Sequence, residues 1–183
     1  MRRPSHFAHH LLAFAWGVAE ATVFFIIPDV LITRAALGSS RSGLLTAAVA
    51  LSGALVGGAI SYQWGATDLA GARHVLDALP AISIGMLDAA RGALTSDGMF
   101  AAFVGSLTGV PYKVFAIHAP SAGIPLSVFV LASIPARGVR FVLLAAIAHA
   151  FARVTGWSTP RLHRVWAIAW TVNYAIYWTL MPN

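Results

Sequence analysis

Cysteine is absent from this sequence, and acidic residues are scarce, with six Asp and Glu against twelve Lys and Arg in 183 residues. Without cysteine there is no disulfide framework, no thiolate nucleophile and no metal site with cysteine ligands. Charged residues make up only 10% of the chain and hydrophobic residues 58%, whereas about 25% of the residues of soluble domains are charged. The composition therefore predicts an all-α integral membrane protein.

The net charge of +6 does not take the form of a nucleic-acid-binding surface. The basic residues are dispersed between apolar runs, as expected when they orient a chain in a membrane, and no patch interleaves them with aromatics. Motifs of membrane enzymes are missing as well. The sequence PSAG at 120–123 lacks the histidine of the lipid-phosphatase element, and neither a GxSG nor an HExxH motif occurs. We expect no enzymatic activity, no cofactor and no nucleic-acid partner.

The first 33 residues have a basic start, an apolar run and an Ala-Glu-Ala sequence at 19–21, as a signal peptide does. The apolar run continues past that sequence to Ile27, so we expect residues 1–33 to belong to the mature structure. Five apolar runs follow one another along the chain, at 11–33, 43–65, 99–119, 124–155 and 164–181. The first and third are each interrupted by a proline beside a charged residue, Pro28-Asp29 and Pro111-Tyr112-Lys113.

The positive-inside bias indicates which runs cross the membrane. If all five crossed, the basic loops would fall on both sides. If 11–33 and 99–123 are re-entrant hairpins, the loop 66–98, with two Arg and four Asp and hence a charge of −2, lies outside. Seven basic residues then lie inside together: Arg2, Arg3, Arg34, Arg41, Arg153, Arg161 and Arg164.

This topology gives a single membrane domain of residues 1–183, with three full crossings at 43–65, 124–155 and 164–181 and an external C-terminus. The loop 66–98 reads as short amphipathic helices on the outer surface, separated at Pro80. The two hairpins enter from opposite faces, so the halves of the chain form an inverted repeat. Inverted repeats place a substrate site at their interface, near the middle of the membrane.

The run 43–65 carries small residues at a spacing of four, Gly53, Gly57, Ser61 and Gly65. A stripe of small residues lets another backbone approach a membrane helix closely. The stripe could receive one of the hairpins, or it could serve ordinary helix packing.

Five charged residues lie inside apolar runs: Glu20, Asp29, Lys113, Arg137 and Arg140. Charges in hydrocarbon are expected to pair, which would bring the two hairpins face to face. Arg137 and Arg140 share a helix face, and two guanidinium groups can bind a phosphate bidentately. Glu20 and Asp29 could accept protons. The alternative is that these pairs only hold the hairpins together.

Histidines offer two further sites. His6 and His10 are four residues apart with His9 between them, a spacing that can bind a metal, but no carboxylate lies nearby. We therefore expect a polar cluster at the membrane interface and no metal. His118 and His149 lie in apolar runs, where they could relay protons or form hydrogen bonds between helices.

The chain resembles the DedA superfamily of membrane proteins, also described as SNARE-associated Golgi or VTT proteins, and especially its short YqaA-like branch. The resemblance covers residues 14–156 and rests on Glu20 with the turn at Pro28-Asp29, the stripe ending in SYQWG, and the sequences GVPYKVFAI and SIPARGVRF. It implies two opposing re-entrant hairpins and movement of lipids between leaflets. Implied site residues are Lys113, Arg137, Arg140, Pro111 and Tyr112 for the substrate, and Glu20 and Asp29 for protons or gating.

From this resemblance we expect a flippase or scramblase of the bacterial inner membrane. It would move a phospholipid or polyprenyl-phosphate lipid, with proton coupling and a homo-oligomer as further expectations. Two other functions stay open. A membrane scaffold would use the same charges only to lock the hairpins, and a small-ion exchanger would move ions without lipid.

Overall fold

The computed structural model describes residues 6–180, and the regular structure in that range is entirely helical. Its helices are α1 (His6–Glu20), α2 (Asp29–Gly38), α3 (Ser40–Thr67), α4 (Leu69–Asp77), α5 (Ile84–Asp97), α6 (Met99–Thr108), α7 (Tyr112–His118), α8 (Leu126–Thr155) and α9 (Thr159–Leu180). The predicted all-α fold is confirmed. Arg2, Arg3 and the end of the last predicted run, Met181, lie outside the described residues, as does the side chain of His6.

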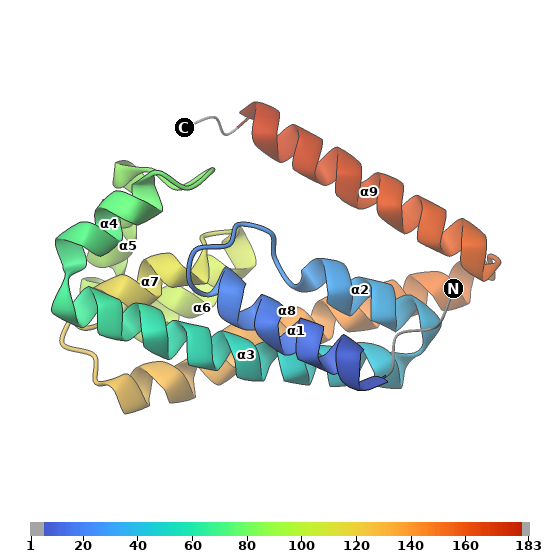
Figure 1. Ribbon diagram of the computed structural model, residues 1–183, viewed down its shortest axis with the longest axis horizontal. Coiled ribbons are helices and arrows are strands. Elements are labelled where there is room, and N and C mark those ends of the chain that lie inside the picture. Colours follow the sequence, from blue (N-terminus) through green and yellow to red (C-terminus); the bar gives the residue numbers. More distant parts are fainter. Residues whose placement is uncertain (1–5, 181–183) are drawn as a thin grey trace.

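Two of the described helices, α3 with 28 residues and α8 with 30, are long and apolar enough to cross a membrane. About 20 residues suffice for a crossing. The two helices lie against each other and run in opposite directions along the molecule (Figure 1). They correspond to the predicted crossings at 43–65 and 124–155. The third predicted crossing corresponds to α9, which is less apolar, and its crossing stays a prediction.

The remaining core helices form two helix–turn–helix units that approach from opposite ends (Figure 1). The first hairpin consists of α1, the turn at 21–28 and α2, and the second consists of α6, the turn at 109–111 and α7. Gly109 ends α6 with φ 94°, a left-handed conformation that favours glycine, and Pro111 precedes the first turn of α7. The tips of both units meet near the middle of the molecule. Re-entry into a membrane stays a prediction.

The small-residue stripe of α3 receives both hairpins. A Cβ atom at Gly53 or Gly57 would collide with the backbone carbonyl of Phe14 or Val18 in α1, and one at Gly65 would collide with that of Ile117 in α7. Between these glycines, the Ser61 hydroxyl donates a hydrogen bond of 2.7 Å to the carbonyl of Ala21. The stripe therefore serves close backbone approach, as predicted, and fixes both hairpins on one helix.

The acidic loop forms α4 and α5, which are separated at Pro80 as predicted. Their apolar faces, however, do not lie free for a membrane surface. Leu76, Leu87 and Leu94 are at most 2% exposed and pack with Val114 and Ile117 of α7 in one hydrophobic cluster. Burial against the second hairpin therefore explains the amphipathic pattern of this segment.

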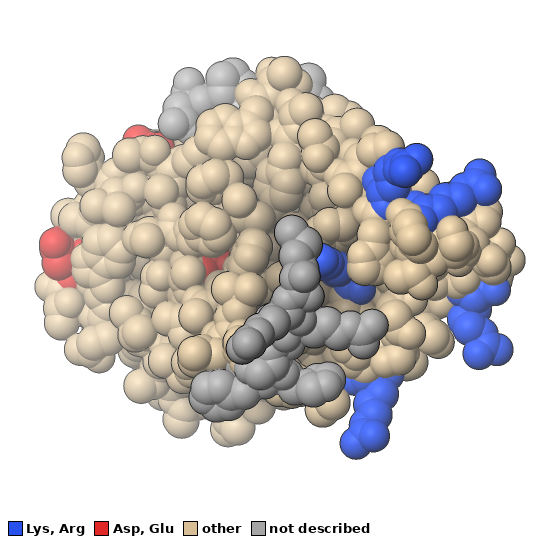
Figure 2. Space-filling model, turned by 45° about the vertical axis from the view of Figure 1, so that its right-hand side comes forward, with Lys and Arg blue, Asp and Glu red and all other residues tan. Residues whose placement is uncertain are grey.

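Charge is segregated along the long axis. Figure 2 shows basic side chains gathered at one end of the molecule and little charge over the central surface. That end is where α3 begins, α8 ends and α9 begins, which places Arg41, Arg153, Arg161 and Arg164 there, and the segment of α4 and α5 carries the loop aspartates at the other end. Between the two ends, large apolar side chains are exposed, among them Leu131, Ile147 and Phe100 at 64% or more. Among the described residues, this distribution of charge agrees with the predicted topology, and insertion into a bilayer stays a prediction.

Candidate functional site

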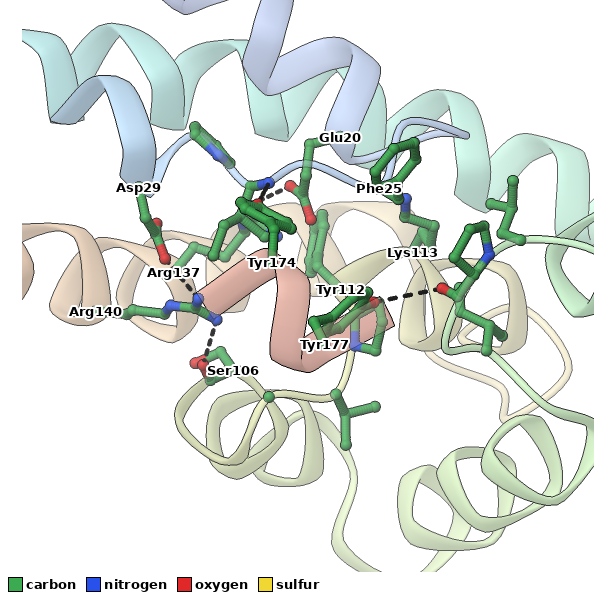
Figure 3. A pocket seen from close by; sticks show the side chains of 18 of the residues that line it. Glu20, Phe25, Asp29, Ser106, Tyr112, Lys113, Arg137, Arg140, Tyr174 and Tyr177 are labelled. Atoms are coloured by element: carbon green, nitrogen blue, oxygen red, sulfur yellow. Dashed lines mark hydrogen bonds and ion pairs between the residues drawn. The ribbon is translucent and has the colours of Figure 1, made fainter. Parts of the chain in front are cut away.

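A cavity of about 180 Å³ lies where the hairpin tips meet α8 and α9 (Figure 3). The structure brings all seven predicted site residues to its wall: Glu20, Asp29, Pro111, Tyr112, Lys113, Arg137 and Arg140. They come from three segments that are far apart in sequence. The first hairpin supplies the acids, the second supplies the lysine, and α8 supplies the arginines.

Arg137 forms the more enclosed of two ion pairs. Its Nη2 lies 2.5 Å from Oε2 of Glu20, and the two side chains are only 7% and 5% exposed. The guanidinium also lies over the ring of Tyr112, at 4.5 Å, and over that of Phe141, at 5.2 Å. Such cation–π contacts stabilise a desolvated cation. Arg137 is thus held on one side by charge and on two sides by rings.

Arg140 forms the second pair, one helical turn further along α8. Its Nη2 lies 2.5 Å from Oδ2 of Asp29, and its Nη1 donates to the backbone carbonyl of Ser106, at 2.9 Å. The Asp29 side chain is 2% exposed, but that of Arg140 is 26% exposed. Arg140 therefore links the first hairpin to the second while part of its guanidinium faces the cavity.

Lys113 differs from both arginines in having no carboxylate within ion-pair distance among the described residues. Its Nζ donates instead to the backbone carbonyl of Phe24 in the turn of the first hairpin, at 2.6 Å. Lys113 is 2% exposed and lies in the first turn of α7, just past the tip of its hairpin. An ammonium has three donor hydrogens, so two remain for other acceptors.

Tyr112 contacts Arg137 with its ring, while its hydroxyl bonds another side chain. The hydroxyl donates to Ser133 Oγ at 2.7 Å, and Ser133 donates in turn to the carbonyl of Phe129 at 2.6 Å. The ring of Tyr112 stacks on that of Phe129, with centroids 5.5 Å apart. These contacts fix the ring beneath the Arg137 guanidinium, so Tyr112 is a positioning residue.

Three cations and two carboxylates give the cavity a formal charge of +1 when all five are ionised. Two buried side-chain atoms have no hydrogen-bond partner among the described residues, Oδ1 of Asp29 and Nε of Arg137. Buried polar atoms are normally hydrogen-bonded, so such exceptions need an explanation. Both belong to residues of the cavity wall. A small group that accepts from the guanidinium and donates to the carboxylate would satisfy them.

Comparison of this chain with protein-family models, curated proteins and solved structures gave no match.

Sequence reasoning missed the part played by α9. Its Trp166 and Trp170 both donate indole N–H groups to Thr33 Oγ1, at 3.0 and 3.1 Å. One and two turns further along, Tyr174 and Tyr177 line the cavity. The spacing of these aromatics, four, four and three residues, places them on one helix face, and that regularity is the signal that could have predicted their common role.

The histidines are in polar contacts. His118 Nδ1 lies 2.7 Å from the carbonyl of Val114, so it is the donor, and Nε2 accepts from Arg73 Nη1 at 2.9 Å. Arg73 also pairs with Asp88 at 2.6 Å, which ties α4, α5 and the second hairpin together. His149 Nδ1 lies 3.2 Å from the carbonyl of Ala36. Neither His118 nor His149 lines the cavity.

Within the described residues, no group of three acidic or histidine side chains could hold a metal.

Proposed function

We propose that the chain moves a phosphate-bearing lipid between the leaflets of a membrane, as a flippase or scramblase of the DedA type with re-entrant hairpins. One observation carries the proposal: five charged groups from three separate segments converge on one cavity, within a molecule whose middle exposes apolar side chains. A lipid headgroup needs polar contacts during its passage, while its chains stay in hydrocarbon. A cavity lined by charged groups, in a molecule with an apolar surface, offers both.

The charge of +1 suits an anionic headgroup. Arg140 is the best candidate for first contact, because its guanidinium is partly exposed to the cavity. The Lys113 ammonium, with two spare donor hydrogens, can take part without breaking an ion pair.

The carboxylates supply a reason for proton coupling. A phosphate bound to Arg140 would take the place of Asp29, and a carboxylate that loses its cation in a buried site binds a proton more readily. Asp29 would then take up a proton when the phosphate binds and release it when the phosphate leaves. This exchange would couple lipid movement to the proton gradient of a bacterial inner membrane, which is where we place the protein.

A scaffold is the second candidate, and the intact ion pairs favour it. Both acids are already paired with arginines, so the charges could simply lock the first hairpin to α8. A buried pair is destabilised when one partner is removed but can often be replaced as a pair without loss of stability.

The two functions are separated by removing the second pair as a unit. In proteoliposomes with fluorescent phosphatidylglycerol or phosphatidylethanolamine, we expect the wild type to exchange lipid, and Arg140→Ala and Asp29→Asn/Arg140→Ala to exchange none. The double variant removes both charges of this pair together, so neither Asp29 nor Arg140 leaves a buried partner without its counter-charge, and the protein should remain folded. Asp88→Ala, which breaks the exposed pair with Arg73, is the control and should exchange lipid normally. Repeating the assay with a pH gradient tests coupling. Ion flux without lipid movement would indicate an exchanger. Absence of lipid exchange and of ion flux in the wild type as well as in the variants would favour the scaffold.

A further inference from the structure

The helix α9 is attached to the rest of the protein mainly at its first half. It packs chiefly on α2, where Thr33 Oγ1 accepts both indole N–H groups and donates its own hydrogen to the carbonyl of Asp29 at 2.7 Å. The hydroxyl of Thr33 is therefore fully used, one turn beyond the acid that pairs with Arg140. This contact fixes the first half of α9 to the first hairpin.

The second half of α9 covers the cavity with few contacts. Figure 3 shows Tyr174 and Tyr177 projecting from α9 across the charged residues. The Tyr174 hydroxyl accepts from the backbone N–H of Ile27 at 3.1 Å, and the Tyr177 hydroxyl donates to the carbonyl of Pro80 at 3.4 Å, a long hydrogen bond. Trp178 adds an edge contact to the ring of Phe25, with centroids 5.3 Å apart.

The wall opposite α9 is rigid by comparison. Pro80 lies in the turn between α4 and α5, next to Ala81, which has a φ of 60°. A left-handed conformation at a non-glycine residue persists only where the surroundings enforce it. Here Ile82, 4% exposed, and Leu79 anchor the turn in the outer hydrophobic cluster. Of the two segments that the Tyr177 hydrogen bond joins across the cavity, the second half of α9 is thus the less firmly attached.

The outward face of α9 is apolar: Ile168, Val172 and Ile176 are 49% to 57% exposed. The mouth beneath α9 therefore faces the same surroundings as the rest of the exposed apolar surface. A ligand that passes there leaves a charged interior and meets hydrocarbon at once.

We infer that the hydrocarbon chain of an amphiphilic ligand enters the cavity sideways, beneath the second half of α9, and that Tyr174 and Tyr177 control this passage. The inference rests on the proposed function for the identity of the ligand, but not for the position of the entrance. Loss of the two tyrosine hydrogen bonds frees the second half of α9, while the Thr33 contact keeps its first half in place.

Lys113 is the only lysine in the chain, so its amine reports directly on access to the cavity. The probes are a palmitoyl N-hydroxysuccinimide ester, which reaches the cavity from the bilayer, and a water-soluble acetyl sulfosuccinimidyl ester. Both are added to protein in phosphatidylcholine and phosphatidylglycerol vesicles, which contain no primary amines. Modification of Lys113 is followed by mass spectrometry of the peptide that contains it.

We expect the palmitoyl ester to modify Lys113 faster than the water-soluble ester. Tyr174→Phe/Tyr177→Phe should raise the palmitoyl rate about threefold or more, because each hydroxyl hydrogen bond stabilises the closed form modestly. Tyr62→Phe is the matched control, since Tyr62 also donates to a carbonyl, that of Ile124 at 2.8 Å, away from the cavity. It should leave the rate unchanged. Thermal unfolding of each variant establishes that the comparison is made on folded protein.

Equal palmitoyl rates in the wild type and the double tyrosine variant would overturn the inference, as would faster reaction with the water-soluble ester. The measurement is independent of transport. If the wild type moves no lipid but Lys113 reacts as expected, the proposed function fails and the entrance stands. If lipid moves but the tyrosine changes do not affect Lys113, the entrance is wrong and the function stands.

Discussion

Arg137 and Arg140 lie three residues apart on α8, and each pairs with a carboxylate of the first hairpin, yet their surroundings differ. Arg137 is enclosed between two rings with a side chain 7% exposed, whereas the side chain of Arg140 is 26% exposed and bonds a backbone carbonyl across the cavity. The more enclosed pair offers a ligand less access than the partly exposed one. We therefore expect the Arg137–Glu20 pair to stabilise the fold and the Arg140–Asp29 pair to bind the ligand.

The largest effect expected from this comparison is on stability. Arg137→Ala leaves the buried carboxylate of Glu20 without a partner, and loss of one member of a buried pair costs about 3 to 5 kcal/mol. Arg140→Ala should cost less, about 1 to 3 kcal/mol, because Arg140 is partly exposed and its truncation would open Asp29 to water in the cavity. Denaturant unfolding in detergent measures both. A smaller loss for Arg137→Ala than for Arg140→Ala would reverse the assignment.

The exposed ion pair between Arg73 and Asp88 provides a reference for these changes in the free energy of unfolding. Asp88 is 61% exposed on its side chain, so Asp88→Ala should change the free energy of unfolding by less than about 1 kcal/mol.

The next largest effect on the free energy of unfolding is expected at the small-residue stripe of α3, which holds both hairpins. Gly65→Ala places a Cβ against the carbonyl of Ile117, which pushes α7, and with it Tyr112, away from α3. Overpacking of this kind costs about 1 to 3 kcal/mol. Gly92→Ala in α5, where a Cβ would meet nothing, should instead stabilise the helix by up to about 1 kcal/mol. Equal effects of the two changes would show that the close approach at Gly65 has no energetic role.

Charge, proline and small-residue spacing were enough to predict much of this arrangement. An apolar chain cannot leave Glu20, Asp29 or Arg137 unpaired, so their convergence followed from the cost of burying ions. The prediction could not assign partners, because pairing depends on helix rotation and on which backbone groups are free. Lys113 illustrates this, since it bonds the carbonyl of Phe24 and no acid.

The contribution of α9 was harder to foresee. Trp166 and Trp170 bond a threonine 133 and 137 residues away, and the run around Thr33 contains nothing that marks it as their acceptor. The faces of α4 and α5 were predicted correctly as amphipathic, but their partner was not. Apolar spacing identifies a face that will be buried and does not say whether protein or lipid covers it.

The smallest expected change in the free energy of unfolding is that of Tyr112→Phe, which tests the role of Tyr112. Tyr112→Phe keeps the ring under Arg137 but removes the hydrogen bond to Ser133, which should cost about 0.5 to 1.5 kcal/mol. Lipid exchange should persist, because Arg140 is untouched. Loss of exchange in a folded Tyr112→Phe protein would mean that the hydroxyl itself contacts the ligand.

The most direct test of the account compares lipid exchange by the wild type and by Asp29→Asn/Arg140→Ala in the same vesicles, with unfolding curves recorded for both. We predict matched unfolding, rapid exchange by the wild type, and exchange by the double variant no faster than in protein-free vesicles. Exchange by the folded double variant at the wild-type rate would contradict the central claim that the Arg140 pair handles the lipid headgroup.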